Sequence, residues 1–182
     1  MKRCFWVDEK SEIYKDYHDN EWGIPKYDDQ QLLELLILES FQAGLSWLTV
    51  LKKRESFRAE FDNFNIDKIV LYDDKKIDSM LSNPKIIRSK NKILSAINNA
   101  KIFKQIQAEY GSFSNYIWGF TDGKIIKRTK DILPVSTELS DKISKDLKKR
   151  GMKYVGTVII YSYLQAVGIV DDHDFDCFKH KK

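Results

Sequence analysis

Residues 14–25 read YKDYHDNEWGIP and bring an unusual set of side chains together. The stretch contains two tyrosines, a histidine, a tryptophan, three acids and an asparagine. A surface loop seldom carries so many large aromatic rings, and a helix buried in a core seldom carries so many polar groups. The composition therefore indicates a site that needs aromatic ring faces, a histidine and acidic groups in one place.

Candidate metal ligands lie near both ends of the chain. Cys4 and His18 are near the start, while His173, Cys177 and His180 are near the end. Two cysteines and two histidines would complete a closed tetrahedral zinc site, which would be structural because it leaves no position for a catalytic water. Spacings of three and four residues both suit one helical turn, so spacing does not choose between His173 and His180. The alternative for each residue is an isolated buried thiol or an ordinary surface histidine.

Basic residues are clustered, although the net charge is only +4. LKKR occurs at 51–54 and again at 147–150, and PKIIRSKNK covers 84–92. Clusters of this kind suit phosphate contacts with nucleic acid, since each neutralised phosphate releases counterion. Each single cluster is equally typical of a solvated helix face. Together, the three make nucleic acid a candidate partner.

The second LKKR leads into a tight turn between two expected helices. The first helix stops at Gly151, and Gly156 and Thr157 open an apolar helix after six residues. Glycines at both ends of the turn would allow positive φ and close approach of another backbone. The N-terminus of the new helix suits one phosphate, with Lys153 beside it. An ordinary corner between two helices is the alternative, but the pattern resembles the helix-hairpin-helix element with which many DNA repair glycosylases hold the duplex backbone.

The remaining sequence favours an all-α fold in one domain, residues 1–182. Hydrophobic residues make up 42% and charged residues 32%, which permits a core in a soluble protein. No apolar run reaches membrane-spanning length, and the first ten residues lack the apolar region of a signal peptide, so a cytoplasmic protein without membrane contact is expected. Apolar periodicity and capping residues predict helices at 28–44, 46–54, 73–81, 89–110, 113–120, 137–150 and 157–168. Residues 121–127 give a weak turn and strand signal.

Several blocks resemble the 3-methyladenine DNA glycosylase I family in that family's order. They are RCFWV (3–7), YHDNEWGIP (17–25), LESFQAGLSWLTVLKKRE (38–55), LKKRGMKYVGT (147–157) and DHDFDC (172–177). The resemblance implies an all-helical fold of the helix-hairpin-helix glycosylase superfamily. The hairpin element would span about 138–168, and zinc-binding termini would span 1–20 and 171–180.

The same resemblance implies roles for individual residues. The zinc ligands would be Cys4, His18, His173 and Cys177, which sets His180 aside. Glu39 would recognise the damaged base, enclosed by Trp6, Tyr14, Tyr17 and Trp47. DNA contacts are expected from Gly151, Lys153, Gly156, Thr157, Lys148 and Lys149, with Leu45 as a wedge into the duplex. The wider superfamily often places a catalytic aspartate after the second helix of the hairpin. Asp171 and Asp172 occupy that region, and Asp171 is the candidate.

The expected activity is monofunctional hydrolysis of the glycosidic bond of a cationic N3-alkylated purine. Such a base must be flipped out of the duplex, and ring faces attract a cation by about 0.5–2 kcal/mol per good contact. Glu39 stands in an apolar stretch, where a carboxylate needs a partner; its alternative is an exposed arc of the helix. No lysine lies within the pocket motifs, which argues against lyase chemistry. A monomer without an obligate protein partner is expected, and the alternatives are a non-enzymatic damage-binding protein and a zinc hydrolase.

Overall fold

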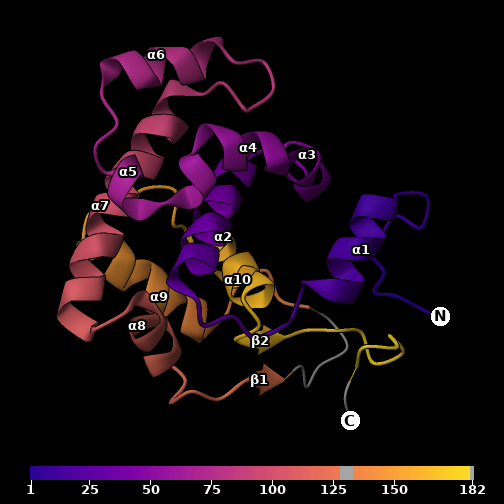
Figure 1. The fold of residues 1–182 in the computed structure, drawn as a ribbon. Coiled ribbons are helices and arrows are strands. Elements are labelled where there is room, and N and C mark those ends of the chain that lie inside the picture. The colour runs from indigo at the N-terminus through magenta and orange to yellow at the C-terminus, as the bar shows by residue number, and fades with distance from the viewer. Residues whose placement is uncertain (128–132, 181–182) are drawn as a thin grey trace.

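The computed structural model describes residues 1–127 and 133–180 and is mostly helical (Figure 1). The all-α prediction is confirmed; the only β pairing among the described residues joins two short parallel strands, β1 and β2, with Ile126 opposite Val170. The elements are α1 (Glu12–Asn20), α2 (Asp29–Gln42), α3 (Trp47–Leu51), α4 (Arg54–Glu60), a 3-10 turn (Asp62–Phe64), α5 (Ile66–Ile69), α6 (Asp74–Ser82), α7 (Lys90–Tyr110), α8 (Phe113–Gly119), β1 (Ile126–Lys127), α9 (Glu138–Lys149), α10 (Thr157–Ala166) and β2 (Val170–Asp171).

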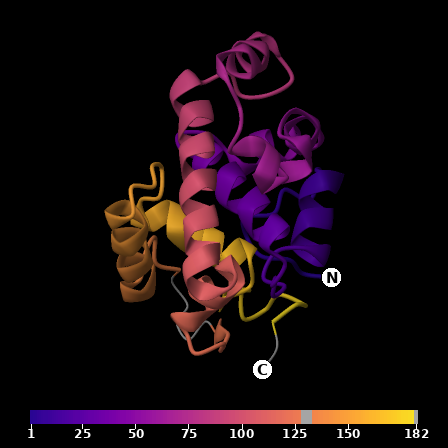
Figure 2. The ribbon, with the colours of Figure 1, turned by 60° about the vertical axis from the view of Figure 1, so that its left-hand side comes forward.

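Helix α2 is the central element of the core. Every residue from Leu32 to Phe41 is buried, as the all-round apolar sequence predicts. The helix packs against α3, α7, α8 and α10, and Figure 2 shows the long α7 beside it. Asp28 caps its N-terminus by accepting a hydrogen bond from the backbone N–H of Gln31. Because α2 is enclosed, any acid on it must find a partner inside the protein or remain unpaired.

Helices α9 and α10 pack against each other and are joined by a short turn. Gly151 ends α9 with φ +96°, a conformation that favours glycine. Gly156 has an ordinary φ of −62°, so the expectation of positive φ at both glycines is wrong; the second left-handed residue of the turn is Tyr154. A Cβ at Gly156 would meet nothing within 4 Å, so this position is open to approach from outside.

The predicted helix boundaries agree with the structure over most of the chain. The segment predicted at 46–54 divides into α3 and α4, with Ser46 capping α3 as expected. Helices α1 and α5 and strand β2 were not predicted. The weak strand signal at 121–127 corresponds to β1 at its end.

The N-terminal segment and the segment around Cys177 lie side by side, where the backbone N–H of Phe178 donates to the carbonyl of Lys2 at 2.9 Å. Residues 23–26 are joined to the end of α10, where the backbone N–H of Gly23 donates to the carbonyl of Gln165 at 3.1 Å. A Cβ on Gly168 would lie 2.4 Å from the backbone of Ile24, so glycine is required at this crossing. Within residues 1–127 and 133–180, no helix is both long and apolar enough to cross a membrane.

Candidate functional site

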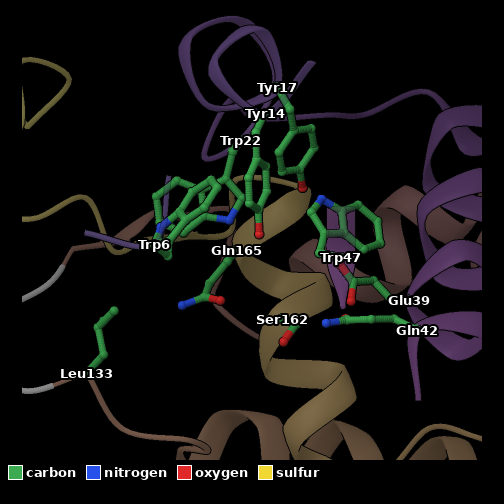
Figure 3. Close-up of a pocket in the computed structure, with 10 residues that line it drawn as sticks. All are labelled: Trp6, Tyr14, Tyr17, Trp22, Glu39, Gln42, Trp47, Leu133, Ser162 and Gln165. Atoms are coloured by element: carbon green, nitrogen blue, oxygen red, sulfur yellow. The ribbon is translucent and has the colours of Figure 1, made fainter. Parts of the chain in front are cut away.

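A cavity of about 280 Å³ opens between the N-terminal segment, α2, α3 and α10. Figure 3 shows aromatic rings along its upper side and polar side chains from α2 and α10 below them. All five residues that the sequence assigns to the base pocket lie in this lining. The full set is Trp6, Tyr14, Tyr17, Trp22, Glu39, Gln42, Trp47, Leu133, Ser162 and Gln165.

The aromatic wall is a continuous group of rings in mutual contact. The ring of Trp6 lies 5.1 Å from that of Tyr14 and 5.0 Å from that of Trp22. The rings of Tyr17 and Trp47 are 5.5 Å apart. Such edge and tilted contacts hold each ring in place. The cavity therefore offers rigid, electron-rich faces to a flat ligand, as a cation requires.

Glu39 lines the cavity with a buried side chain that lacks a complete set of partners. The residue is 3% exposed, and its Oε2 atom has no hydrogen-bond partner among the described residues. Burial raises the pKa of Glu39 to about 8, so the empty pocket favours a neutral carboxyl at pH 7. The predicted buried position of Glu39 is confirmed, and its alternative, an exposed arc of the helix, is wrong.

The indole of Trp47 adds a second unpaired polar atom to the same cavity. Its Nε1–H has no acceptor among the described residues, although the residue is 8% exposed. A buried donor and a buried acceptor left unpaired are each costly. A ligand that accepts from Trp47 and donates to Glu39 would relieve both costs.

Five lining residues were not assigned from the sequence: Trp22, Gln42, Leu133, Ser162 and Gln165. Trp22 and Gln42 fall inside the quoted motifs, whereas Leu133 does not. Ser162 and Gln165 are polar residues three apart in the largely apolar α10. This spacing puts both on one helix face, a signal that could have found them.

An ion-pair network supports the aromatic wall from behind. The guanidinium of Arg54, which is 8% exposed, donates from Nε to Glu34 at 2.6 Å and from Nη1 to Glu21 at 2.6 Å. Glu21 directly precedes Trp22, so this network fixes the segment that carries the ring. Arg54 is thus a structural residue whose charge is already balanced by Glu21 and Glu34.

Three of the four proposed zinc ligands form a compact group. The ligand atoms of Cys4, His18 and Cys177 lie within 4.8 Å of one another, and all three residues are buried. The fourth, His173, has its ring 5.3 Å from that of His18. Its Nε2 atom is buried and has no partner among the described residues. His180 instead directs Nδ1 to the carbonyl of His173 at 3.2 Å.

The surroundings of this group suit thiolate and imidazole ligands. Backbone N–H groups of Asp174 and Lys179 approach the sulfurs of Cys4 and Cys177 at 3.3 Å and 3.4 Å. Burial raises the pKa of the Cys4 thiol, and the neighbouring Cys177 raises it further, so a cation would be needed to hold a thiolate there.

Both histidines have a carboxylate on Nδ1. His18 Nδ1 lies 2.8 Å from Asp19, and His173 Nδ1 lies 2.6 Å from Asp171. The Nε2 atom of His18 lies 3.4 Å from the sulfur of Cys177, and that of His173 is left without a partner among the described residues; a carboxylate on the second ring nitrogen is common for metal-binding histidines. Asp171 orients His173 and is not among the cavity-lining residues, so its geometry gives no support to the predicted catalytic role.

The hairpin places only part of its basic run toward solvent. Lys148, Lys149 and Lys153 are exposed. Arg150 pairs with Glu109 at 2.6 Å and with Asp146 at 2.8 Å, so its charge is already balanced within the protein. The hydroxyl of Thr157 forms a hydrogen bond with that of Ser140 at 2.8 Å. The group of Thr157 that could donate to a phosphate is therefore its backbone N–H.

The other basic clusters also supply structural cations. Lys53 Nζ donates to the carbonyls of Pro84 and Lys85. Lys92 Nζ donates to the carbonyls of Phe41 and Ala43 at the end of α2. This contact holds the loop that presents Leu45, whose side chain is 41% exposed. The predicted wedge is thus placed on a supported, solvent-facing turn.

Fold and cavity together define a helical protein with a pocket for a flat, electron-poor ring. The chain belongs to the methyladenine glycosylase family, whose sequence model matches residues 6–180.

The chain is 42% identical over 180 residues to DNA-3-methyladenine glycosylase 1 of Escherichia coli (strain K12), with 97% of this chain and 96% of the relative covered. A crystal structure of 3-methyladenine DNA glycosylase I is 44% identical and superimposes with a TM-score of 0.95, covering 99% of this chain and all of the other. A structure that addresses 3-methyladenine recognition by the Staphylococcus aureus enzyme is 35% identical with a TM-score of 0.94, covering 100% and 98% of the two chains.

Proposed function

We propose that the protein is a monofunctional DNA glycosylase that flips and hydrolytically releases 3-methyladenine from alkylated double-stranded DNA. The observation that carries this proposal is the unpaired, buried carboxyl of Glu39 at the end of an aromatic cavity. Relatives named for the same activity cover almost the whole chain.

The charge of the substrate explains why these groups suit it. A base alkylated at N3 is a cation while it is still attached to the sugar. An approaching cation favours the ionised form of Glu39, so binding converts a neutral carboxyl into a carboxylate that accepts the exocyclic N–H. Undamaged adenine is neutral and leaves Glu39 in its protonated form. Selectivity therefore follows from charge as well as from shape.

The pocket residues hold the base while the glycosidic bond breaks. The bond electrons return to a cationic ring, which makes the base a good leaving group and requires little acid catalysis. No lysine is among the described residues that line the cavity, so the proposed reaction uses water as the nucleophile.

We further propose that Cys4, His18, His173 and Cys177 hold one structural zinc ion. The support is the S₂N₂ donor set, the unpaired Nε2 of His173 and the carboxylates behind both imidazoles. When bound, the metal would keep the thiols deprotonated and join the two ends of the chain. His18 lies one residue from Tyr17 of the pocket, so the site would also fix the aromatic wall.

The purified protein is expected to release 3-methyladenine from methylated duplex DNA and to leave the resulting abasic sites uncut. Chromatography of released bases and gel analysis of strand integrity measure the two outcomes. Borohydride trapping of a covalent protein–DNA adduct would contradict the monofunctional mechanism. Tight binding of methylated DNA without any base release would identify a damage-binding protein instead.

DNA affinity is expected to depend on salt through Lys148, Lys149 and Lys153. Replacing one of them with glutamine should lower the slope of log K against log salt by about one unit if its phosphate contact is lost. Arg150→Gln is the matched control from the same run, because Arg150 is internally paired: it should lower the Tm and leave the slope unchanged. An unchanged slope in all three lysine variants would place the DNA on another surface.

A further inference from the structure

Gln165 differs from the other polar residues of the cavity because a buried carboxylate controls its orientation. Its Nε2 donates to Asp172 Oδ2 at 2.7 Å. Asp172 is 4% exposed and also accepts a hydrogen bond from the hydroxyl of Tyr161. These three residues connect α10 to the segment after β2.

The chemistry of this contact fixes which end of the amide faces the cavity. A carboxylate oxygen accepts hydrogen bonds, so the NH₂ group of Gln165 must point to Asp172. The carbonyl Oε1 is then turned the other way, and Figure 3 shows the two ends of the amide pointing apart, with the oxygen on the side of Ser162. Gln165 therefore presents a fixed acceptor to the cavity.

Position along the cavity separates Gln165 from the residues that hold the base. Glu39 and Gln42 lie together on one side, while Gln165 lies on the opposite side (Figure 3). Glu39 is almost fully buried, whereas Gln165 is partly exposed. If Glu39 accepts from the exocyclic amine, the glycosidic nitrogen on the other ring of the purine points toward the side of Gln165.

We propose that Gln165 Oε1 accepts a hydrogen bond from the water that attacks the sugar, and that Asp172 is the positioning residue that keeps this oxygen in place. The proposal rests on the glycosylase activity proposed above. The C1′–N9 bond breaks and its electron pair goes to N9, which gives a neutral base and a sugar cation. The water oxygen then forms the new bond to C1′, and its surplus proton passes to solvent.

An amide oxygen is sufficient for this role. The water becomes acidic only after it has bonded to the cationic carbon, so no strong base is needed to begin the attack. The reaction requires that a lone pair of the water oxygen points at C1′. Misplacement of a reacting group by about 1 Å can lower the rate by on the order of a hundredfold. A carbonyl dipole facing the sugar also stabilises its developing positive charge.

The test compares the same substitution on the two sides of the cavity. Gln165→Met removes the acceptor at nearly constant shape and is expected to slow single-turnover excision by roughly tenfold to a hundredfold, with unchanged affinity for free 3-methyladenine and for undamaged duplex. Gln42→Met, beside Glu39, is expected to reduce excision and free-base affinity together. Melting temperature and tryptophan fluorescence verify that each variant is folded.

Three outcomes would overturn the inference. Excision at the parent rate in Gln165→Met would show that Gln165 does not position the water. A loss of affinity for free 3-methyladenine as large as the loss of excision would show that Gln165 contacts the base instead. If Gln165→Met does not fold, Asp172→Asn is the deciding variant, because the introduced amide can donate to the Gln165 carbonyl and turn it away from the cavity. Excision at the parent rate in Asp172→Asn would contradict the positioning role of Asp172. If the parent protein itself released no base, the proposed function would fail instead, so the two failures are distinguishable.

Discussion

Glu39→Gln is expected to lose base excision and free 3-methyladenine affinity together, while binding to undamaged duplex is unchanged. Glutamine keeps the shape of the side chain but removes the charge and replaces one acceptor oxygen with a donor. The loss should be about 1.5–3 kcal/mol, typical of a hydrogen bond to a charged group. Excision kinetics, titration with the free base and duplex binding measure the three quantities. Excision at the parent rate would show that Glu39 has no part in recognition.

The same variant is expected to be more stable than the parent, by an amount that grows with pH. The pKa of Glu39 is raised from 4.5 to about 8 by burial. The favourable contribution of Glu39 to the free energy of unfolding is therefore fully present below pH 4.5 and is lost as the pH rises through 8. The reason is that the carboxyl loses its proton at a lower pH in the unfolded chain than in the folded protein. Glutamine does not titrate, so the gain in Tm should increase between pH 5 and pH 8 and then level off.

Glu34→Gln is the matched control, since it makes the same change on the same buried helix. Glu34 accepts hydrogen bonds from Arg54 and Arg58, so removing its charge leaves the buried guanidinium of Arg54 with less compensation. This variant should have a lower Tm than the parent at neutral pH. Equal Tm changes in the two variants would contradict the distinction between a paired acid and an unpaired one.

Loss of a proposed zinc ligand is expected to damage stability far more than base chemistry. Cys4→Ser or His173→Ala should lower the Tm by roughly 10 °C, since metal binding and folding are coupled. Elemental analysis of the parent should find one zinc per chain, and strong chelators should reproduce the loss. His180→Ala is the control and should have a small effect, because His180 contacts a backbone carbonyl rather than the cluster. Absence of zinc, or equal damage from His180→Ala, would contradict this ligand set.

The main helices could be predicted because apolar periodicity and capping residues, which determine them, lie within each helix or directly beside it. The apolar run of α2 predicts burial, and Ser46 caps α3 as its position suggests. Strand β2 was missed because two residues carry no periodicity, and its pairing with β1 is decided by packing of distant segments. Helix α1 was missed because its composition favoured a site over a helix, and it proved to be both.

The site could be predicted where a residue type implies its chemistry, and could not where pairing decides the role. Glu39 in an apolar run already requires a partner, so its position in the cavity follows. The sequence around Arg54 and Arg150 suggests phosphate contacts, because the neighbouring residues do not reveal that Glu34 and Glu109 pair with these arginines in the folded protein. Only the fold distinguishes a cation that is paired internally from one that is free for DNA.

The joining of the two chain ends has a consequence for how the protein is made. Cys177 and His18 are 159 positions apart, yet their side chains meet at 3.4 Å. Synthesis proceeds from the N-terminus, so residues 3–25 leave the ribosome with their tryptophans and tyrosines long before α10 and the segment around Cys177 exist. Until then these rings lack the later segments against which they pack, and they remain exposed to contacts with other chains. The segment that supplies most of the aromatic wall is thus among the first to be made and the last to be buried.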